Sequence, residues 1–224
     1  SGLTILFGFP APIILALMIN EVKNSAFKRT VQTITYMPYF ISMVVLCGLL
    51  KTFSMQDGLF SQIATVFGGK AQNFLANPNY FRTIYVLSDI WSGIGWNSII
   101  YLAALSSIDQ EQYEAARVDG ANRFQQMLHI TLPGLVPTIM ILFILRMGNI
   151  LNVGYEKILL LYNSATYSTA DVISTYTYRL SFGGSGNPMY SKSTAIGLFN
   201  TIINVFFLML TNMISKKATD AGLF

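Results

Sequence analysis

Apolar residues gather in five stretches along the chain, and each stretch is long enough to form a membrane-spanning helix. A bilayer core about 30 Å thick needs about 20 helical residues, and polar segments separate the five stretches from one another. Pro10, Pro12 and Pro38 predict kinks in the first two spans, which a helical bundle tolerates because neighbouring helices satisfy the freed carbonyls. We therefore expect an all-α membrane protein with spans at Leu3–Asn20, Val31–Phe53, Thr83–Ile108, Leu135–Val153 and Ala195–Ile214.

Small residues in the third span predict that another helix packs closely against it. They are Ser92, Gly93, Gly95 and Ser98. The single cysteine, Cys47, lies inside an apolar run and is interpreted as a small core residue.

Lysine and arginine residues near the span ends indicate the orientation of the chain. They are denser in the turn Glu21–Thr30, between the third and fourth spans and in the C-terminal tail than in the longer segments Ser54–Arg82 and Gly154–Thr194. Because positive residues favour the cytoplasmic side, we expect the two longer segments to be external and the C-terminus to be cytoplasmic. Five spans then put the N-terminus outside.

The second external segment has a pattern of its own. Val172, Ile173, Tyr176 and Leu180 recur at helical spacing, which predicts a surface-lying or re-entrant helix. The glycine-rich run 183–188 after it predicts a flexible turn. Both a plain connector and a functional external loop remain open for this segment.

Composition agrees with a membrane protein and excludes several other classes. Hydrophobic residues make up 53% of the chain and charged residues 11%, whereas a soluble domain carries about twice that charge. The net charge of +4 comes from basic residues that are scattered or flank apolar spans, so it does not form a phosphate-tracking patch. We expect the lipid bilayer as a partner and no nucleic acid.

Asp89 and Arg146 fall inside the predicted spans, away from the span ends, and each needs a partner or a water-filled cavity there. Asp89 lies roughly 9 Å inward from the outer start of the third span, and Arg146 lies roughly 20 Å outward from Pro133 on the fourth. Both therefore lie in the outer half of the bilayer. A structural ion pair between them and the lining of a substrate cavity are both open, and the two do not exclude each other.

Other polar groups extend this candidate cavity. Trp96 lies near the middle of its span beside Asn97, and a flat ring next to hydrogen-bonding amides suits the face of a sugar, although core packing is the simpler role for an aromatic side chain. Asn149 shares a helix face with Arg146. The candidate cavity residues are Asp89, Trp96, Asn97, Arg146, Asn149 and Asn152.

A polar segment between the third and fourth spans predicts two short helices joined by a glycine. Asp109 is a plausible N-cap for the good helix formers after it. Gly120 can end this helix in a left-handed conformation, so that a second helix begins at Ala121. Pro133 then lies in the first turn of the next apolar segment, where its missing N–H costs nothing.

The surface of this segment favours contact with another protein. Small residues at Ala115 and Ala116 allow close approach, while Glu114, Arg117, Asp119 and Arg123 offer charge pairing. The alternative is an interfacial helix on lipid headgroups, which the acidic residues make less suitable for an anionic membrane surface.

Motifs for catalysis and metal binding are absent from the sequence. Gly69-Lys70 is followed by alanine and lacks the upstream glycine of a phosphate-binding loop. His129 is the only histidine, and no second histidine or cysteine lies near it to build a metal site. We expect no catalytic residue, no metal site and no enzymatic activity in this chain.

The segment from Glu114 to Pro133 also has the spacing E-A-A-x3-G-x9-I-x-L-P. This spacing resembles the signature loop of the membrane subunits of ABC importers at every fixed position. Further runs resemble permeases of carbohydrate ABC importers, most of all the oligosaccharide or polysaccharide type. These runs are Asp89-Ile90-Trp91, Gly95-Trp96-Asn97, Tyr101 to Leu105, Phe9 to Pro12, Asn152 to Lys157 and Asp171 to Tyr176.

The resemblance implies a fold and a set of partners. The fold is a type I importer permease bundle formed by one transmembrane domain, 1–224, with a cytoplasmic coupling loop at 109–133 and a sixth helix expected upstream of Ser1. The partners are a second permease subunit, two nucleotide-binding ATPase subunits that bind ATP and magnesium, and an external solute-binding protein that delivers a carbohydrate. The location implied is a bacterial cell membrane, which the chain crosses several times.

Two other classes of protein remain as rivals. A secondary transporter or channel working alone predicts several intramembrane carboxylates, and Asp89 is the only one in the predicted spans. A purely structural scaffold does not need Asp89 and Arg146 at membrane depth. Neither rival accounts for the signature loop.

Overall fold

The computed structural model describes residues 2–152, 154–183, 187–219 and 222–223, and every regular element among them is helical. The N-terminal half contains η1 (Thr4–Gly8), α1 (Pro10–Glu21), α2 (Ser25–Tyr36), η2 (Met37–Phe40), α3 (Met43–Ser54), α4 (Leu59–Val66), η3 (Phe74–Ala76) and α5 (Pro78–Ser106). The C-terminal half contains α6 (Gln110–Val118), α7 (Arg123–Gln126), η4 (Met127–Thr131), α8 (Leu132–Met147), α9 (Tyr155–Leu161), α10 (Tyr167–Ala170), α11 (Ile173–Phe182) and α12 (Tyr190–Thr219).

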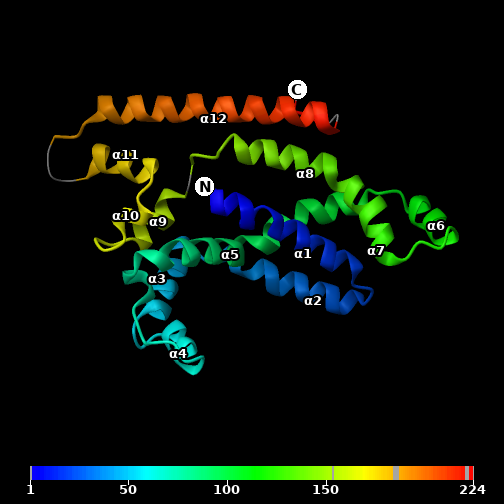
Figure 1. Ribbon diagram of the computed structural model, residues 1–224, viewed down its shortest axis with the longest axis horizontal. Coiled ribbons are helices and arrows are strands. Elements are labelled where there is room, and N and C mark those ends of the chain that lie inside the picture. The colour runs from blue at the N-terminus through cyan, green and yellow to red at the C-terminus, as the bar shows by residue number, and fades with distance from the viewer. Residues whose placement is uncertain (1, 153, 184–186, 220–221, 224) are drawn as a thin grey trace.

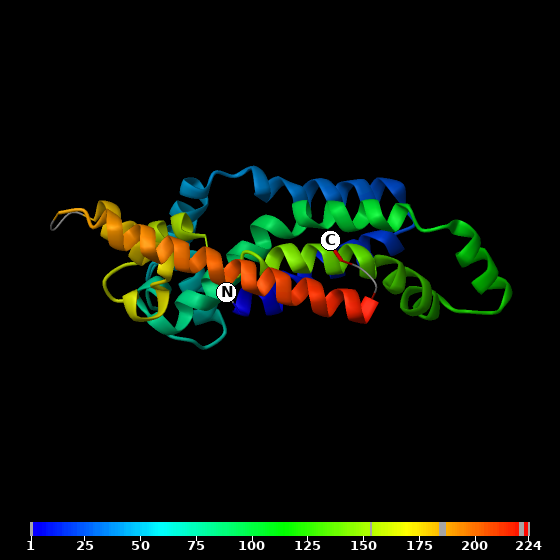
Figure 2. The same cartoon turned by 90° about the horizontal axis from the view of Figure 1, so that it is seen from above.

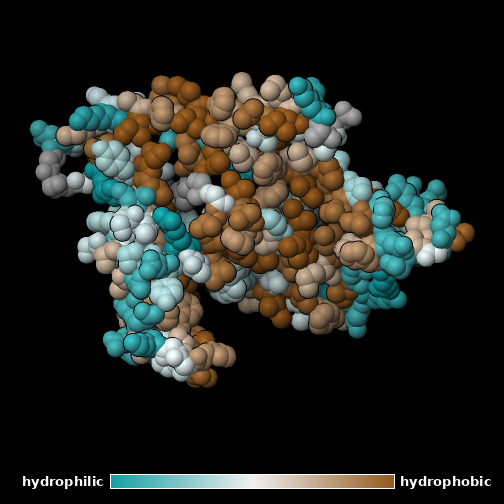
Figure 3. Space-filling model, viewed as in Figure 1, coloured by the Kyte–Doolittle hydropathy of each residue, from teal (hydrophilic) through white to brown (hydrophobic). Residues whose placement is uncertain are grey.

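The long helices lie side by side, and the short ones gather at the two ends of the molecule. Helix α5 is central and packs against α1, α2 and α8, while α12 packs against α8 and α11 (Figures 1 and 2). The α6–α7 segment projects from one end, and α3, α4, α9, α10 and α11 lie towards the other. Hydrophobic side chains dominate the face between these ends, and both ends are more hydrophilic (Figure 3).

Four segments are long and apolar enough to cross a membrane among the described residues: Thr4–Glu21, Met43–Val66, Arg123–Met147 and Tyr190–Lys217. The predicted number of five spans differs from this number. Helix α5, the predicted third span, accounts for the difference, because its 29 residues are long enough but polar side chains such as Ser88, Asp89 and Asn97 lower its mean hydropathy. Two of these polar residues, Asp89 and Asn97, face a cavity of the bundle.

The predicted second span, Val31–Phe53, is wrong as a single helix. Pro38 lies in the 3-10 helix η2, and Ile41 and Ser42 are extended, with ψ angles of 128° and 146°. The Ser42 side chain accepts a hydrogen bond from the backbone N–H of Val45 and so caps a new helix. The apolar segment of this region is therefore displaced towards Met43–Val66.

The other predicted boundaries are closer to those observed. Helix α5 begins five residues before Thr83, because Asn77 caps its first turn and Pro78 comes next, in the position that needs no N–H. Helix α8 ends at Met147, and the predicted end at Val153 lies outside the described residues. The helix predicted around Val172–Leu180 is confirmed as α11, and the turn after it falls partly on residues that are not described.

Two clusters of buried side chains stabilise the fold. One joins α3, α5, α9 and α10 and includes Cys47, which is 2% exposed, as predicted for a core cysteine. The other joins α1, α5 and α8 through Ala16, Tyr101, Leu105 and Leu135. Both clusters meet on α5, so the central helix fixes the relative positions of the elements around it.

Close helix packing on α5 is confirmed at Gly95. A Cβ atom placed on Gly95 would collide with the backbone carbonyl of Thr35 and lie 2.9 Å from the ring of Tyr36. Helix α2 therefore approaches α5 at a distance that only glycine allows.

Candidate functional site

A polar cavity opens between η1, α5, α8 and α9. It consists of two adjoining hollows of about 370 and 480 Å³. Both hollows share Thr4, Asp89, Arg146, Asn149 and Asn152 in their lining, so we treat them as one cavity and refer to it as the central cavity. Gly154, Tyr155, Glu156 and Lys157 line only the smaller hollow, whereas Asn97 and Tyr101 line only the larger one.

Five of the six predicted cavity residues line this cavity. Asp89 and Asn97 come from α5, Arg146 comes from the last turn of α8, and Asn149 and Asn152 come from the segment after it. Trp96 is the exception. Its indole stacks on Tyr39 with ring centroids 4.7 Å apart and meets the edge of Phe40, which places it among the residues of η2.

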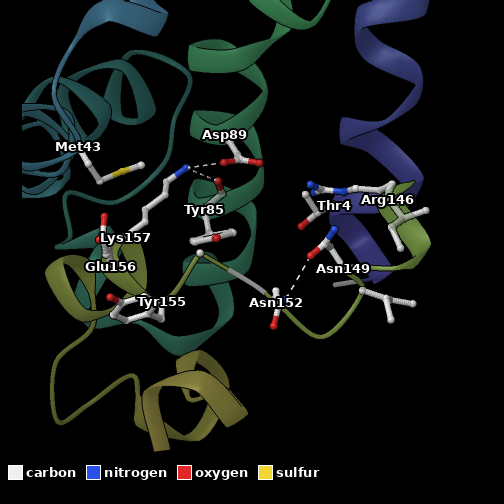
Figure 4. Close-up of a pocket in the computed structure, with 13 residues that line it drawn as sticks. Thr4, Met43, Tyr85, Asp89, Arg146, Asn149, Asn152, Tyr155, Glu156 and Lys157 are labelled. Carbon is white, nitrogen blue, oxygen red and sulfur yellow. Dashed lines mark hydrogen bonds and ion pairs between the residues drawn. The ribbon is translucent and has the colours of Figure 1, made fainter. Parts of the chain in front are cut away.

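Of the two alternatives left open for Asp89 and Arg146, the structure supports the cavity lining, and no ion pair joins these two residues in the described part of the chain. Asp89 pairs with Lys157, whose Nζ lies 3.4 Å from Asp89 Oδ1. The same Nζ donates to the backbone carbonyl of Tyr85 at 3.1 Å and lies 4.6 Å from the centre of the Tyr85 ring. Figure 4 shows Lys157 extending from α9 to α5, with Arg146 on the opposite side of the cavity.

Burial explains why Lys157 needs these partners. Its side chain is 2% exposed, whereas that of Asp89 is 40% exposed and faces the cavity. A buried ammonium without an anionic partner is costly, so the carboxylate and the carbonyl stabilise its charge. Lys157 was not among the residues predicted from the sequence. The available signal was the apolar run Ile158–Tyr162 directly after it, which indicated burial next to a charged residue.

The amides on the α8 side form a short chain of hydrogen bonds. Asn149 Nδ2 donates to the carbonyl of Leu145 at 3.2 Å, and Asn152 Nδ2 donates to Asn149 Oδ1 at 3.2 Å. Leu151 N–H donates to Asn204 Oδ1 on α12 at 3.2 Å. These bonds hold the segment after α8 against its neighbours and present its amides to the cavity (Figure 4).

The α6–α7 segment has the N-cap and the glycine turn that the sequence predicts, but the second helix begins at Arg123 rather than at Ala121, because Asn122 is extended and caps it. The Asp109 side chain accepts from the N–H of Glu111 at 3.0 Å and caps α6. Gly120 has a φ of +79°. The N–H of Gly120 donates to the Arg117 carbonyl at 3.1 Å and that of Ala121 to the Ala116 carbonyl at 2.8 Å. These two bonds are those of a Schellman motif, which ends α6 sharply.

The second short helix is capped and joined to the first. The side chains of Asn122 and Gln125 form a reciprocal capping box at 2.8 and 2.9 Å. Tyr113 Oη lies 3.0 Å from Thr131 Oγ1, which connects α6 to η4. This segment is therefore a fixed pair of helices that leads directly into α8.

The outer surface of this pair is exposed. The predicted coupling residues Glu114, Ala115, Arg117, Asp119, Gly120 and Arg123 are exposed, and Ala116 is half-buried. Arg123 Nη1 lies 3.6 Å from Glu21 Oε2, a surface contact that contributes little free energy. Two apolar side chains that were not predicted as coupling residues, Val118 and Phe124, are 89% and 66% exposed. Apolar residues within a polar segment were the available signal for them.

Metal binding is not indicated anywhere in the described part of the chain, because no group of three or more histidine, cysteine, aspartate or glutamate residues is close enough to hold an ion. Within the same residues, His129 is bonded through Nδ1 to the carbonyl of Gln125 at 3.0 Å.

Comparisons with known proteins agree with this architecture. Residues 8–220 match the family model described as "Binding-protein-dependent transport system inner membrane component". Protein LplB of Bacillus subtilis is 42% identical over 100% of this chain and 70% of its own length. The polygalacturonan/rhamnogalacturonan transport system permease protein YteP of the same organism is 41% identical over 96% of this chain and 67% of its own length.

Solved structures give the same result. A chain of a bacterial ABC transporter involved in the import of the acidic polysaccharide alginate is 48% identical, with a TM-score of 0.93 over 98% of this chain and 76% of that chain. A chain of a bacterial alginate ABC transporter in complex with a periplasmic protein that carries an alginate pentasaccharide is also 48% identical. It has a TM-score of 0.95 over 100% of this chain and 77% of that chain.

Proposed function

Because the chain belongs to the family of binding-protein-dependent transport system inner membrane components, we propose that it is the permease subunit of an ATP-driven importer of oligosaccharides. The chain is a membrane permease component of this family, with several helices long and apolar enough to cross a membrane, and in this proposal it is not itself an enzyme.

The observation that carries the proposal is the central cavity inside an apolar helical bundle. Amides from Asn97, Asn149 and Asn152 and the charged groups of Asp89 and Arg146 line it. Sugars present many hydroxyl groups, each of which can donate and accept hydrogen bonds, so a lining of amides and charged groups suits them. The transport systems named for YteP and for alginate carry oligosaccharides or polysaccharides, and their likeness to this chain supports the same class of cargo.

The partners are inferred from the coupling loop at 109–133. Its two capped helices form a rigid exposed surface with small, charged and apolar side chains, which is suited to docking a separate ATPase domain. In this proposal two such domains bind ATP and magnesium, and a second permease completes the cavity. An external solute-binding protein delivers the sugar. Closure of the ATPases moves the α6–α7 pair, and because this pair leads directly into α8, the movement reaches Arg146 and the cavity.

The orientation proposed places α6, α7 and the C-terminal end of α12 in the cytoplasm, with α4, α9, α10 and α11 outside. Labelling tests this arrangement directly. With Cys47 replaced by alanine, single cysteines at Asn77 or Asn187 react with a membrane-impermeant thiol reagent applied from outside. Cysteines at Asn122 or Thr219 react only after the membrane is opened. The reverse pattern would invert the orientation.

Uptake tests the function itself. The permease is reconstituted in proteoliposomes with its second permease, its ATPases and its binding protein, and entry of a labelled oligosaccharide is measured with and without ATP. We expect uptake that requires both ATP and the binding protein. Uptake that needs neither would instead indicate a transporter or channel that works alone.

A further inference from the structure

The charged side chains of the central cavity are not equally available to a substrate. Four of them line it: Asp89, Arg146, Glu156 and Lys157. Lys157 is buried, and its charge is matched by Asp89 at 3.4 Å. Glu156 lines only the smaller hollow and belongs to α9, on the side of the cavity opposite Arg146 (Figure 4). In the larger hollow, Arg146 is therefore the charge that no ion pair balances among the described residues.

The surroundings of Arg146 suit an anionic group on a polar ligand. Its guanidinium carries a positive charge and offers five donors in a planar fork. Thr4 lies beside it, and Asn149 lies one turn further along the chain (Figure 4). Asn97 lines the larger hollow from α5. One cation and several neutral hydrogen-bonding groups thus converge on a space of about 480 Å³.

Charge balance indicates what belongs in this space. Arg146 is exposed and lines the cavity, so its guanidinium is accessible to a ligand there, and the fork of arginine matches the two oxygens of a carboxylate. We propose that Arg146 binds a carboxylate of the transported sugar, so that the cargo is an oligosaccharide that contains uronic acid residues. This inference rests on the proposed function and adds a substrate class and a specificity-determining residue to it.

The Asp89–Lys157 pair has a defined part in this assignment. Because Lys157 neutralises Asp89, the carboxylate of Asp89 does not compete with the substrate for Arg146 and repels an incoming anion less. The Asp89–Lys157 pair and Arg146 lie on opposite sides of the cavity (Figure 4). The substrate therefore passes between a side whose charges cancel and a side with a net positive charge.

The test compares two labelled trisaccharides in the reconstituted complex. One is a tri-uronate, and the other is its carboxyl-reduced form, in which each carboxylate is replaced by a CH2OH group. Uptake of both is measured for the wild type and for Arg146→Gln, Arg146→Lys and Arg82→Gln. The last variant is the matched control, because Arg82 lies on α5 but does not line the central cavity.

We expect Arg146→Gln to lower uptake of the tri-uronate roughly 10- to 100-fold, as the loss of hydrogen bonds to a charged group implies. Uptake of the carboxyl-reduced form should stay within about twofold of the wild-type value. Arg146→Lys retains the charge without the planar fork, so its uptake of the tri-uronate should lie between that of the wild type and that of Arg146→Gln. Arg82→Gln behaves as the wild type. Equal losses for both sugars, or unchanged uptake of the tri-uronate in Arg146→Gln, would overturn the assignment.

The failure of this inference differs from the failure of the proposed function. If the wild type takes up neither trisaccharide in an ATP-dependent manner, the proposed function is refuted for such cargo. If it takes up either one and Arg146→Gln does not change the ratio between them, oligosaccharide import stands and the role of Arg146 does not.

Discussion

Replacing Asp89 with asparagine should destabilise the protein by leaving the Lys157 ammonium buried without its anion. The direct attraction across 3.4 Å is about 5 kcal/mol at an effective dielectric of about 20. Loss of one partner of a fully buried pair costs about 3–5 kcal/mol. Asp89 is 40% exposed and the ammonium retains the Tyr85 carbonyl, so we expect a smaller loss of about 2–3 kcal/mol.

The partner substitution should behave differently. Lys157→Met removes the buried charge and keeps most of the side-chain volume, while the Asp89 side chain is 40% exposed and can be hydrated. We expect a loss below about 1 kcal/mol for Lys157→Met, because no unpaired charge remains buried. The double variant Asp89→Asn/Lys157→Met should then resemble Lys157→Met alone.

Thermal or denaturant unfolding of all three variants in the same detergent gives the coupling energy of the pair, which we expect to be about 2 kcal/mol. The control cycle combines Asp89→Asn with Arg146→Gln, which should add within about 0.5 kcal/mol because no ion pair joins these residues. Additive losses for Asp89 and Lys157, or strong coupling between Asp89 and Arg146, would refute the assignment of partners.

Three further predictions concern other parts of the molecule. Gly120→Val forces a β-branched residue into a φ of +79°, so it should abolish the stimulation of the ATPase by substrate. The control is Gly197→Ala, where a Cβ meets no atom within 4 Å, and it should leave this stimulation unchanged. Normal stimulation in Gly120→Val would contradict the role of the loop. Gly95→Ala should lower the unfolding temperature, because its Cβ collides with the Thr35 carbonyl of α2, and an unchanged melting curve would mean that α2 moves away freely. The Arg179 hydrogen bonds at 2.6 and 2.8 Å hold the pKa of Asp171 below its usual value. The stabilisation from this pair is therefore present above the unfolded pKa of about 3.9 and is lost as the pH falls through the lower folded pKa. Acid should therefore reduce the protection of α11 amides in hydrogen exchange, and Asp171→Asn should remove this acid dependence.

Local features of the site could be predicted from the sequence because they depend on residues close together in the chain. The Asp109 cap, the left-handed Gly120 and the start of a second helix after it depend on hydrogen bonds that span at most five residues. The close approach at Gly95 was predictable as a property of small residues, although the identity of the neighbouring helix was not.

The partner of Asp89 could not be predicted, because Lys157 is 68 residues away and lies in a short helix that no membrane-span criterion identifies. Asp89 and Arg146 line one cavity, in agreement with their similar depth in the predicted spans. Depth alone does not say which faces of two helices meet, and a third element can come between them. The same limit applies to Trp96, whose neighbours Tyr39 and Phe40 come from a break in the predicted second span.

Transport through the central cavity requires that the cavity open alternately to the two sides of the membrane. The direct test places a cysteine at Asn97, which lines the larger hollow, in a chain where Cys47 is alanine. Its rate of reaction with an impermeant thiol reagent applied from outside is then measured in the assembled transporter, with and without trapped nucleotide. We expect a reaction that is slow in the resting complex and at least about tenfold faster when the ATPases are held closed. This ratio corresponds to a change of about 1.4 kcal/mol in the free energy of the outward-accessible state. Equal rates in the two states would contradict alternating access through this cavity.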